Sequence, residues 1–444
     1  MFRFYRYAFP GLIALVLGFR LGAIVLIRPA PVMDEPFHLK VTQQFGPGLP
    51  SVAQLRDYAS ASGPLFYVAF GNLGALVGYN LTALRLAVFV MSLASLLLFY
   101  RVLKRLLPTD NPLPAVALLA TAPYFSALAG MLMTEHLALC LGLAALLCYL
   151  RFRDAGRPLD AILTLLFVTL AIYTRSFFIF LPAAFAINDI ATNRTPYTVN
   201  RAPLSDRDPS LITHRSSLIA SLLWLLPILA FVPMVVLWRG LAPPTFQYIY
   251  HAGFEWQNAS SLLIWTGVVF LPWVWHKHKL KHKPWYLLSL IAIPLVLLSP
   301  VPGLGITHSA LKRLPHPLAL VAACLLGMAG LLWYIQIAPL AIGRYAAFRE
   351  NRGQSHEGSR QTHAGTVPVF AVASPLPQVA AIGALLLAAG LLVSGPSVFE
   401  RYLLPGIPLM LICARPGTKP GLALLWAGLF QLPLALAHML RLAA

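Results

Sequence analysis

Long apolar stretches recur along the whole chain, and they constrain its fold more than any other feature. Each stretch is about 16 to 22 residues long, which lets an α-helix cross a bilayer core of roughly 30 Å. The stretches lack the strand-like alternation of a β-barrel, and backbone groups inside lipid must satisfy their own hydrogen bonds. The sequence therefore predicts an all-α fold, a polytopic transmembrane helical bundle.

The composition excludes a soluble protein, because 59% of the residues are hydrophobic and only 11% are charged. The net charge of +19 would suit a nucleic-acid partner. The Lys and Arg residues, however, lie between the apolar stretches, as the positive-inside rule expects of cytoplasmic loops. We therefore expect a lipid bilayer as a partner and no nucleic acid. The four cysteines fall inside apolar stretches, so no disulfide framework is expected. Their spacing also does not match that of metal ligands.

The basic residues also set the predicted topology. Arg3 and Arg6 place the N-terminus in the cytoplasm, and a retained first helix leads to an extracytoplasmic loop over 28–82 that carries juxtamembrane helices. Residues 113–131 are expected to form one helix that returns to the outer face. The scheme gives about 13 spans, with a range of about 11 to 14, because helix boundaries are the weakest part of such predictions. Residues 1–444 form a single module, with cytoplasmic loops at 189–215 and 340–377.

This topology rests on the basic residues alone, and it divides the 14 acidic residues between the two faces. The acids on the outer face are Asp34, Glu35, Asp57, Glu135, Glu255 and Glu400. Two of them, Glu135 and Glu400, lie beside apolar stretches with few charges nearby, and such carboxylates need a partner or a task. Asp34 and Glu35 directly follow the first helix, where acids are rare and usually functional. The alternative is an acidic helix flank.

Carboxylates and basic residues on one membrane face suit a particular reaction. A carboxylate can act as general base toward a hydroxyl nucleophile. Basic side chains can hold a phosphate leaving group and stabilise its developing charge. The basic residues predicted on this face are Arg175, Lys312, Arg313 and Arg401. The pattern favours glycosyl transfer from a polyprenyl-phosphate sugar, which needs one base and a good leaving group.

Four short motifs carry a resemblance to a known superfamily. They are the Asp34-Glu35 pair, Ser62-Gly63-Pro64-Leu65-Phe66-Tyr67, Leu170-Ala171-Ile172-Tyr173-Thr174-Arg175 and Glu400-Arg401-Tyr402-Leu403-Leu404-Pro405. They resemble motifs of the GT-C superfamily of integral membrane glycosyltransferases. Met33-Asp34-Glu35-Pro36-Phe37-His38 is most similar to a motif of the dolichyl-phosphoglucose alpha-1,2-glucosyltransferases. The chain lacks the Ile-Thr-Thr-Pro-Pro-Gly-Leu-Tyr segment expected after that motif. We therefore infer a resemblance to the superfamily alone and leave the glucosyl substrate open.

The resemblance implies roles for individual residues. In the superfamily the first acidic pair of the first outer loop carries the catalytic base, which implies catalytic roles for Asp34 and then Glu35. The residues expected to bind substrate are His38, Glu135, His136, Arg175, Glu400, Arg401 and Tyr402. The donor would be a polyprenyl-phosphate-linked sugar, dolichyl or undecaprenyl, and the acceptor a glycan, lipid or protein. Some members use a divalent cation such as Mg²⁺ or Mn²⁺ and others do not, so no cofactor is assigned.

Each of these residues also has a purely structural interpretation. Glu135 and His136 suit the start of a helix, Arg175 can extend to the membrane interface, and Glu400 with Arg401 can form a local ion pair. At the level of the whole protein, a transporter or flippase of a lipid-linked saccharide is the alternative to an enzyme, and a ligase would share the fold. The absence of a soluble domain favours a prokaryotic plasma membrane over the endoplasmic reticulum.

Overall fold

The computed structural model describes residues 2–32, 34–108, 110–193, 221–240, 242–249, 256–277, 289–298, 311, 313–342, 376–392, 404–414 and 419–443. Every regular element within these ranges is a helix, so the predicted all-α class is confirmed. The chain is an integral, multi-pass membrane protein. Six described helices are long and apolar enough to span a bilayer: Phe4–Ile27, Leu81–Leu106, Glu135–Ala155, Ser221–Trp238, His316–Ala338 and Pro420–Ala437. Several shorter apolar helices accompany them, and the count of about 13 spans stays a prediction.

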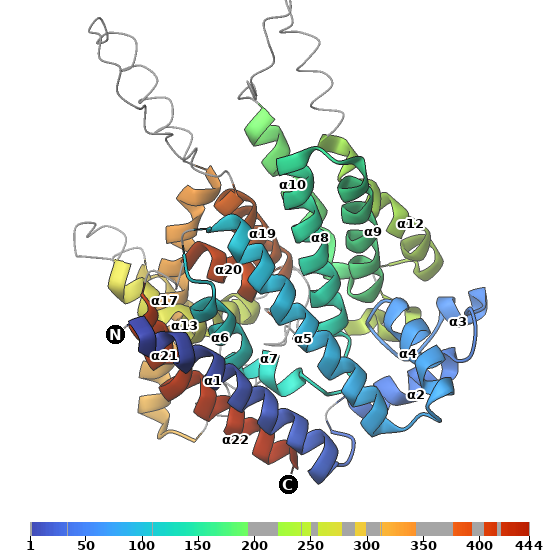
Figure 1. The fold of residues 1–444 in the computed structure, drawn as a ribbon, viewed down its shortest axis with the longest axis horizontal. Helices are drawn as coiled ribbons and strands as arrows, with labels where there is room; N and C mark the ends of the chain where they lie inside the picture. Colours follow the sequence, from blue (N-terminus) through green and yellow to red (C-terminus); the bar gives the residue numbers. More distant parts are fainter. Residues whose placement is uncertain are drawn as a thin grey trace, which may run out of the picture.

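The first half of the chain forms a bundle of long helices (Figure 1). They are α1 (Phe2–Gly22, continued by a π-helix over Ala23–Ile27), α5 (Leu81–Leu106), α8 (Glu135–Ala155), α9 (Pro158–Thr174), α10 (Phe180–Asn193) and α12 (Leu226–Trp238). The short helix η2 (Ser176–Ile179) leads from α9 into α10. Arg105 Nε lies 2.6 Å from Asp154 Oδ2, so the C-terminal ends of α5 and α8 are side by side. The predicted topology places these two ends on the same, cytoplasmic face.

The first loop folds into three short helices, α2 (Glu35–Phe45), α3 (Val52–Arg56) and α4 (Leu65–Leu76). Ser51 starts α3 with a capping box, in which its hydroxyl accepts from the Gln54 amide and Gln54 Oε1 accepts from the Ser51 amide. Two glycines pack this loop closely. A Cβ on Gly71 would lie 2.9 Å from Thr42 O on α2, and one on Gly63 would lie 2.0 Å from the Tyr173 carbonyl of α9.

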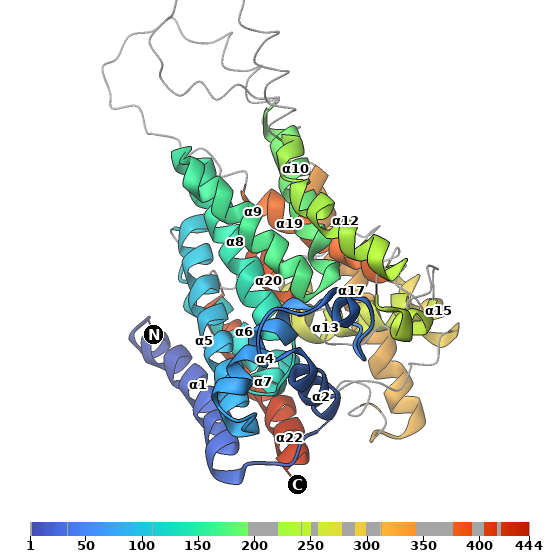
Figure 2. The same ribbon diagram turned by 90° about the vertical axis from the view of Figure 1, so that its right-hand side faces the viewer.

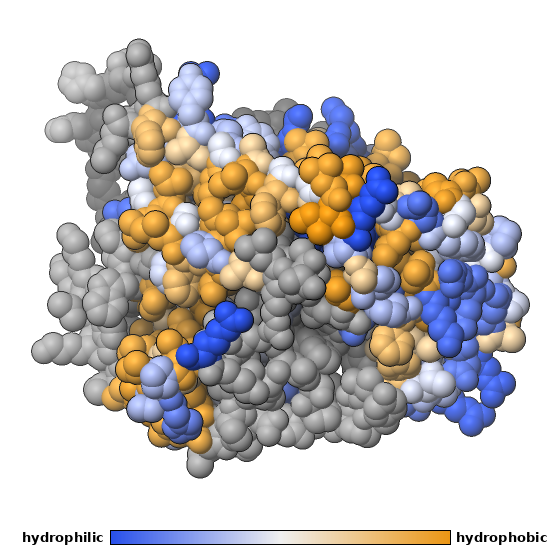
Figure 3. All heavy atoms as spheres, turned by 90° about the horizontal axis from the view of Figure 1, so that it is seen from below, coloured by the Kyte–Doolittle hydropathy of each residue, from blue (hydrophilic) through white to orange (hydrophobic). Residues whose placement is uncertain are grey.

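The loop helices gather at one end of the bundle, and the C-terminus of α10 lies at the other (Figures 1 and 2). Seen from below, the molecule is hydrophobic over much of the described surface, with hydrophilic residues concentrated where α2 and α3 lie (Figure 3). Helices α2, α3 and α4 confirm the expectation of helices within 28–82, and the extracytoplasmic position of this loop stays a prediction.

Residues 113–131 do not form the single helix that was predicted. They form α6 (Leu113–Thr121) and α7 (Pro123–Leu128), and an irregular segment over 129–134 then leads to α8. Pro123 has no amide hydrogen to continue α6. Helix α7 ends at Leu128, and Gly130 follows with φ +90°, a conformation that residues with a side chain rarely adopt and that an α-helix does not contain.

The second half of the chain contributes the remaining helices. These are α13 (Trp256–Lys277), α15 (Ala292–Leu298), α17 (His316–Ile342), α19 (Leu376–Leu392), α20 (Gly406–Ala414), α21 (Pro420–Trp426) and α22 (Leu432–Ala443), with a 3-10 helix over Pro244–Ile249 and a π-helix over Ala427–Gln431. Gly267 and Gly330 bring α13 and α17 into backbone contact, because a Cβ on either would lie about 2 Å from a carbonyl of the other helix. Helix α1 lies beside α21 and α22 (Figure 1).

The predicted cytoplasmic loop at 189–215 begins later than expected, because α10 continues to Asn193. Asp189 is buried rather than solvated. Its carboxylate accepts hydrogen bonds from Tyr149 at 2.6 Å and Trp224 at 2.7 Å, and it pairs with Arg153. The helix is therefore held by side chains that lie far away in sequence. Most of this loop, and nearly all of 340–377, lies outside the described residues.

Candidate functional site

Asp34 stands at the start of α2, as its N-cap residue. Its side chain is half-buried and makes no capping hydrogen bond to the helix backbone. Pro36 follows within the first turn, where its missing amide hydrogen costs nothing. The positive end of the helix dipole stabilises a carboxylate at this position. Asp34 is thus placed at the surface of the first loop, and Met33 before it lies outside the described residues.

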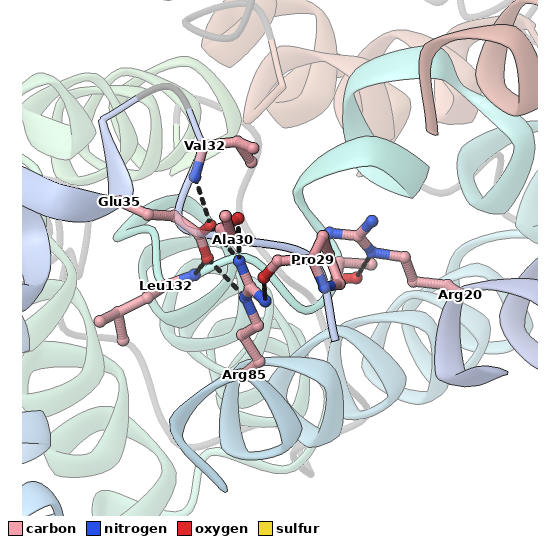
Figure 4. A network of polar contacts seen from close by, with 8 residues as sticks. Arg20, Pro29, Ala30, Val32, Glu35, Arg85 and Leu132 are labelled. Carbon is pink, nitrogen blue, oxygen red and sulfur yellow. Dashed lines mark hydrogen bonds and ion pairs between the residues drawn. The ribbon is translucent and has the colours of Figure 1, made fainter. Parts of the chain in front are cut away.

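Glu35, the next residue, is in a different environment, because its side chain is fully buried. Oε1 accepts hydrogen bonds from Arg85 Nε at 2.9 Å and from the Leu132 amide at 2.8 Å. Oε2 accepts from Arg85 Nη2 at 2.6 Å and from the Val32 amide at 3.1 Å (Figure 4). Four donors therefore surround this carboxylate, and it joins α2 to α5 and to the irregular segment before α8.

All three guanidinium nitrogens of Arg85 donate hydrogen bonds within the same network. Besides Glu35, its guanidinium donates to the carbonyl of Pro29 at 2.6 Å and to that of Ala30 at 3.1 Å. It therefore holds the chain as it leaves α1 as well as the chain as it enters α2 (Figure 4). Buried charges are tolerated when they are paired and hydrogen-bonded in this way.

A second buried ion pair joins Glu135 at the start of α8 to Arg175 at the end of α9. Their side chains are only 1% and 4% exposed. Glu135 Oε2 also accepts from Thr134 Oγ1 at 3.3 Å, and that hydroxyl lies 3.4 Å from Ser62 Oγ in the first loop. Arg175 is therefore held inside the protein and does not extend to the membrane interface, which was the structural alternative.

The two buried pairs are connected through a few residues of backbone. Leu132, whose amide donates to Glu35, lies three residues before Glu135. Residues 129–134 are almost fully buried although they are not helical. Irregular backbone at membrane depth is tolerated where protein groups satisfy it, and here the Glu35 carboxylate satisfies one of its amides. The structure thus brings the first loop against the segment that leads into Glu135, and a shared substrate site for these residues stays a prediction.

His38 lies one turn along α2 from Asp34 and is 6% exposed. Its Nδ1 lies 2.7 Å from Tyr67 Oη, which in turn lies 2.5 Å from Ser60 Oγ. The rings of His38 and Tyr67 stack, with centroids 5.8 Å apart and planes 18° apart. Burial raises the pKa of Tyr67 well above its usual range, so the phenol stays neutral, and the charges of Arg175 and Glu135 are near enough to affect it.

His136 is fully buried beside Glu135. Its Nε2 lies 3.2 Å from the carbonyl oxygen of Phe125 on α7, and the two rings meet edge to face at 4.7 Å. Its Nδ1 has no hydrogen-bond partner in the described part of the chain. A substrate-binding role for His136 stays a prediction. The remaining predicted site residues, Glu400, Arg401 and Tyr402, lie outside the described residues.

No group of three His, Cys, Asp or Glu side chains within the described ranges is arranged to hold a metal ion. We therefore assign no cation site to these residues.

Sequence reasoning missed Arg85, Tyr67 as a partner of His38, and Arg20 on α1. A signal existed for Arg20, because a charged residue within an apolar span is costly and usually functional. Arg85 follows the start of α5 and resembles an ordinary basic flank. Nothing local indicates that its partner is Glu35, which lies 50 residues away.

Residues 62–202 match the sequence model of a family described as dolichyl-phosphate-mannose-protein mannosyltransferase. The match covers about a third of the chain and includes Glu135, His136, Arg175 and Arg85, whereas Asp34 precedes it. This is a GT-C glycosyltransferase family, so the resemblance predicted from the motifs is confirmed over this segment. No curated protein matches the sequence.

Two similar solved structures are crystal structures of ArnT from Cupriavidus metallidurans, one bound to undecaprenyl phosphate and one in the apo state. Each is 17% identical to this chain and covers 94% of it. The aligned regions cover 76% and 77% of the ArnT chains, with TM-scores of 0.38 and 0.39.

Proposed function

We propose that this chain is a membrane glycosyltransferase that moves a sugar from a polyprenyl-phosphate donor to a hydroxyl acceptor on the extracytoplasmic face. The match of residues 62–202 to a family of GT-C glycosyltransferases supports the enzyme class. The placement of basic residues supports the side of the membrane. The donor class follows from the superfamily and from the buried cationic groups near the first loop.

The observation that carries the proposal is the contrast between Asp34 and Glu35. Glu35 is enclosed and accepts four hydrogen bonds, so substrate cannot reach it without disrupting the network. Asp34, on the adjacent position, is half-buried at the surface of the loop. This contrast supports Asp34 as the general base and gives Glu35, predicted beside it as a second catalytic acid, the task of holding α2 in place.

The reaction needs one proton transfer and one displacement. Asp34 takes the proton of the acceptor hydroxyl as its oxygen attacks the anomeric carbon of the donor sugar. The bond between that carbon and the phosphate oxygen breaks, and polyprenyl phosphate leaves with the electron pair. Positive charge near the leaving phosphate stabilises it. We propose Arg401 for direct contact with the phosphate, and Arg175, which is buried against Glu135, for a positive charge behind it. A single displacement of this kind inverts the anomeric centre and does not need the paired carboxylates of a glycoside hydrolase.

The test is to separate sugar transfer from lipid movement. The purified full-length chain, reconstituted in liposomes, is given undecaprenyl-phosphate hexoses and pentoses together with a membrane glycolipid acceptor fraction. Mass spectrometry then follows the release of undecaprenyl phosphate. Release that depends on both the chain and the acceptor supports the enzyme. Movement of the intact lipid-linked sugar between leaflets, with no release, would favour the flippase alternative and refute the proposal.

A further inference from the structure

Arg20 is a buried cation within the first span that the network around Glu35 leaves without a counter-ion. Its side chain lies on α1 and is 5% exposed. Its Nε donates one hydrogen bond, of 2.5 Å, to the carbonyl of Ala129. In the described part of the chain it makes no other hydrogen bond and no ion pair. A guanidinium carries five N–H donors, so the described residues leave most of its capacity to bind an anion unused.

The charged groups that act on Arg20 are Glu35 and Arg85. These two already neutralise each other at 2.6 Å, and the remaining lone pairs of Glu35 accept backbone amides. Arg20 therefore adds one positive charge to a neutral, buried pair. A buried charge without a partner is costly, and within a membrane span it usually marks a ligand site.

The position of Arg20 limits how an anion can approach it. It lies seven residues before Ile27, which at 1.5 Å per residue is about 10 Å inside the end of the span. Between these residues, Leu21, Leu26 and Ile27 are exposed apolar side chains that suit contact with lipid. Figure 4 shows the Arg20 side chain pointing from α1 toward the Glu35–Arg85 pair. The approach from this flank is through lipid, which favours an anion carried on a lipid over one dissolved in water.

We propose that Arg20 binds the phosphate group of a polyprenyl phosphate, the lipid product of the proposed reaction. The two terminal guanidinium nitrogens form a planar fork that matches two phosphate oxygens. The phosphate supplies the missing counter-charge, and the isoprenoid chain lies against the apolar flank of α1. The identity of this lipid rests on the proposed function, whereas the need for an anion rests on the burial and charge of Arg20.

The probe is undecaprenyl phosphate alone, titrated into the full-length chain in detergent and followed by native mass spectrometry. Arg20→Gln keeps an N–H donor for Ala129 and removes the charge. We expect it to bind the probe at least about 10-fold more weakly, with an unchanged melting temperature. Arg20→Lys keeps the charge but loses the planar fork, so it should bind the probe more weakly than the wild type and more tightly than Arg20→Gln. Arg28→Gln is the matched control, because Arg28 is an exposed basic residue just beyond the same span.

Undiminished binding by Arg20→Gln would overturn the site. If Arg20→Gln fails to fold, Arg20→Lys still decides, since binding by that folded variant equal to binding by the wild type would contradict the two-point contact of the guanidinium with the phosphate. Inorganic phosphate or phosphatidylglycerol that displaces the probe at equal concentration would overturn the assignment to a polyprenyl phosphate. No sugar donor is present, so a chain that binds the probe through Arg20 yet transfers no sugar would retain this site and refute the proposed function.

Discussion

The Glu35 carboxylate and the Arg85 guanidinium meet at two points, 2.6 Å and 2.9 Å apart, and neither side chain is more than 3% exposed. This contact joins α2 to α5 directly after Asp34. It therefore fixes where the proposed base stands relative to the bundle.

Removing Arg85 should destabilise the whole fold. Arg85→Met leaves the Glu35 carboxylate buried without its partner, which costs about 3–5 kcal/mol. The double variant Glu35→Met/Arg85→Met should cost less than the sum of the two single variants, because no isolated charge remains. Thermal unfolding in detergent measures all three. Arg56→Met, an exposed residue of the same loop, is the control, and a loss for Arg85→Met no greater than for this control would contradict the role of the pair.

Arg175→Lys should reduce sugar transfer more than it reduces stability. Lysine keeps the positive charge beside Glu135 but loses the planar fork, so a bidentate contact with carboxylate or phosphate is lost. We expect about a 10-fold or greater fall in transfer rate, with the chain still folded. Arg105→Lys is the matched control, because the Arg105–Asp154 pair is exposed, and such pairs contribute about 0–1 kcal/mol. Equal effects of the two substitutions on transfer would refute a special role for Arg175.

The first loop should lose stability at alkaline pH. Burial, reinforced by Tyr67, raises the pKa of Tyr58 well above its ordinary value of 10.0. The folded state therefore binds this proton more tightly than the unfolded state. The contribution of the protonated Tyr58 phenol to the free energy of unfolding is fully present below about pH 10. It falls as the pH rises from there toward the folded-state pKa.

Melting temperatures measured between pH 8 and pH 11 test this expectation. Tyr58→Phe should fall less steeply over the alkaline part of that range than the wild type, although it starts lower because the 2.7 Å hydrogen bond to the Ser62 carbonyl is gone. Parallel curves for the two proteins would show that Tyr58 does not titrate with unfolding.

Much of the fold could be predicted from the sequence, because apolar length and basic flanks act locally. The helices that end at Leu106 and Ala155 follow this rule. The prediction failed where a residue far away decides the structure. Asp189 was predicted in a loop from its polar neighbours, and it is helical because Trp224 and Tyr149 hold it. Periodicity carries no information about such pairings.

The candidate site could likewise be predicted only where the signal in the sequence is local. Residue type and position next to apolar spans singled out Glu135 and Arg175, and the structure pairs them. The same criteria treated Asp34 and Glu35 alike, yet the structure separates them, since Glu35 points to Arg85 across 50 residues of sequence. Which of two adjacent acids is buried depends on tertiary packing. Neither composition nor motif spacing predicts that packing.

The most direct test of the account is the sugar-transfer rate of Asp34→Asn in liposomes with an undecaprenyl-phosphate sugar. Asparagine keeps the size of the side chain and cannot take the acceptor's proton, so the rate should fall by about 100-fold or more. Asp57→Asn, which alters an exposed acid of the same loop, should transfer at the wild-type rate. Transfer by Asp34→Asn that equals that of Asp57→Asn would contradict Asp34 as the general base.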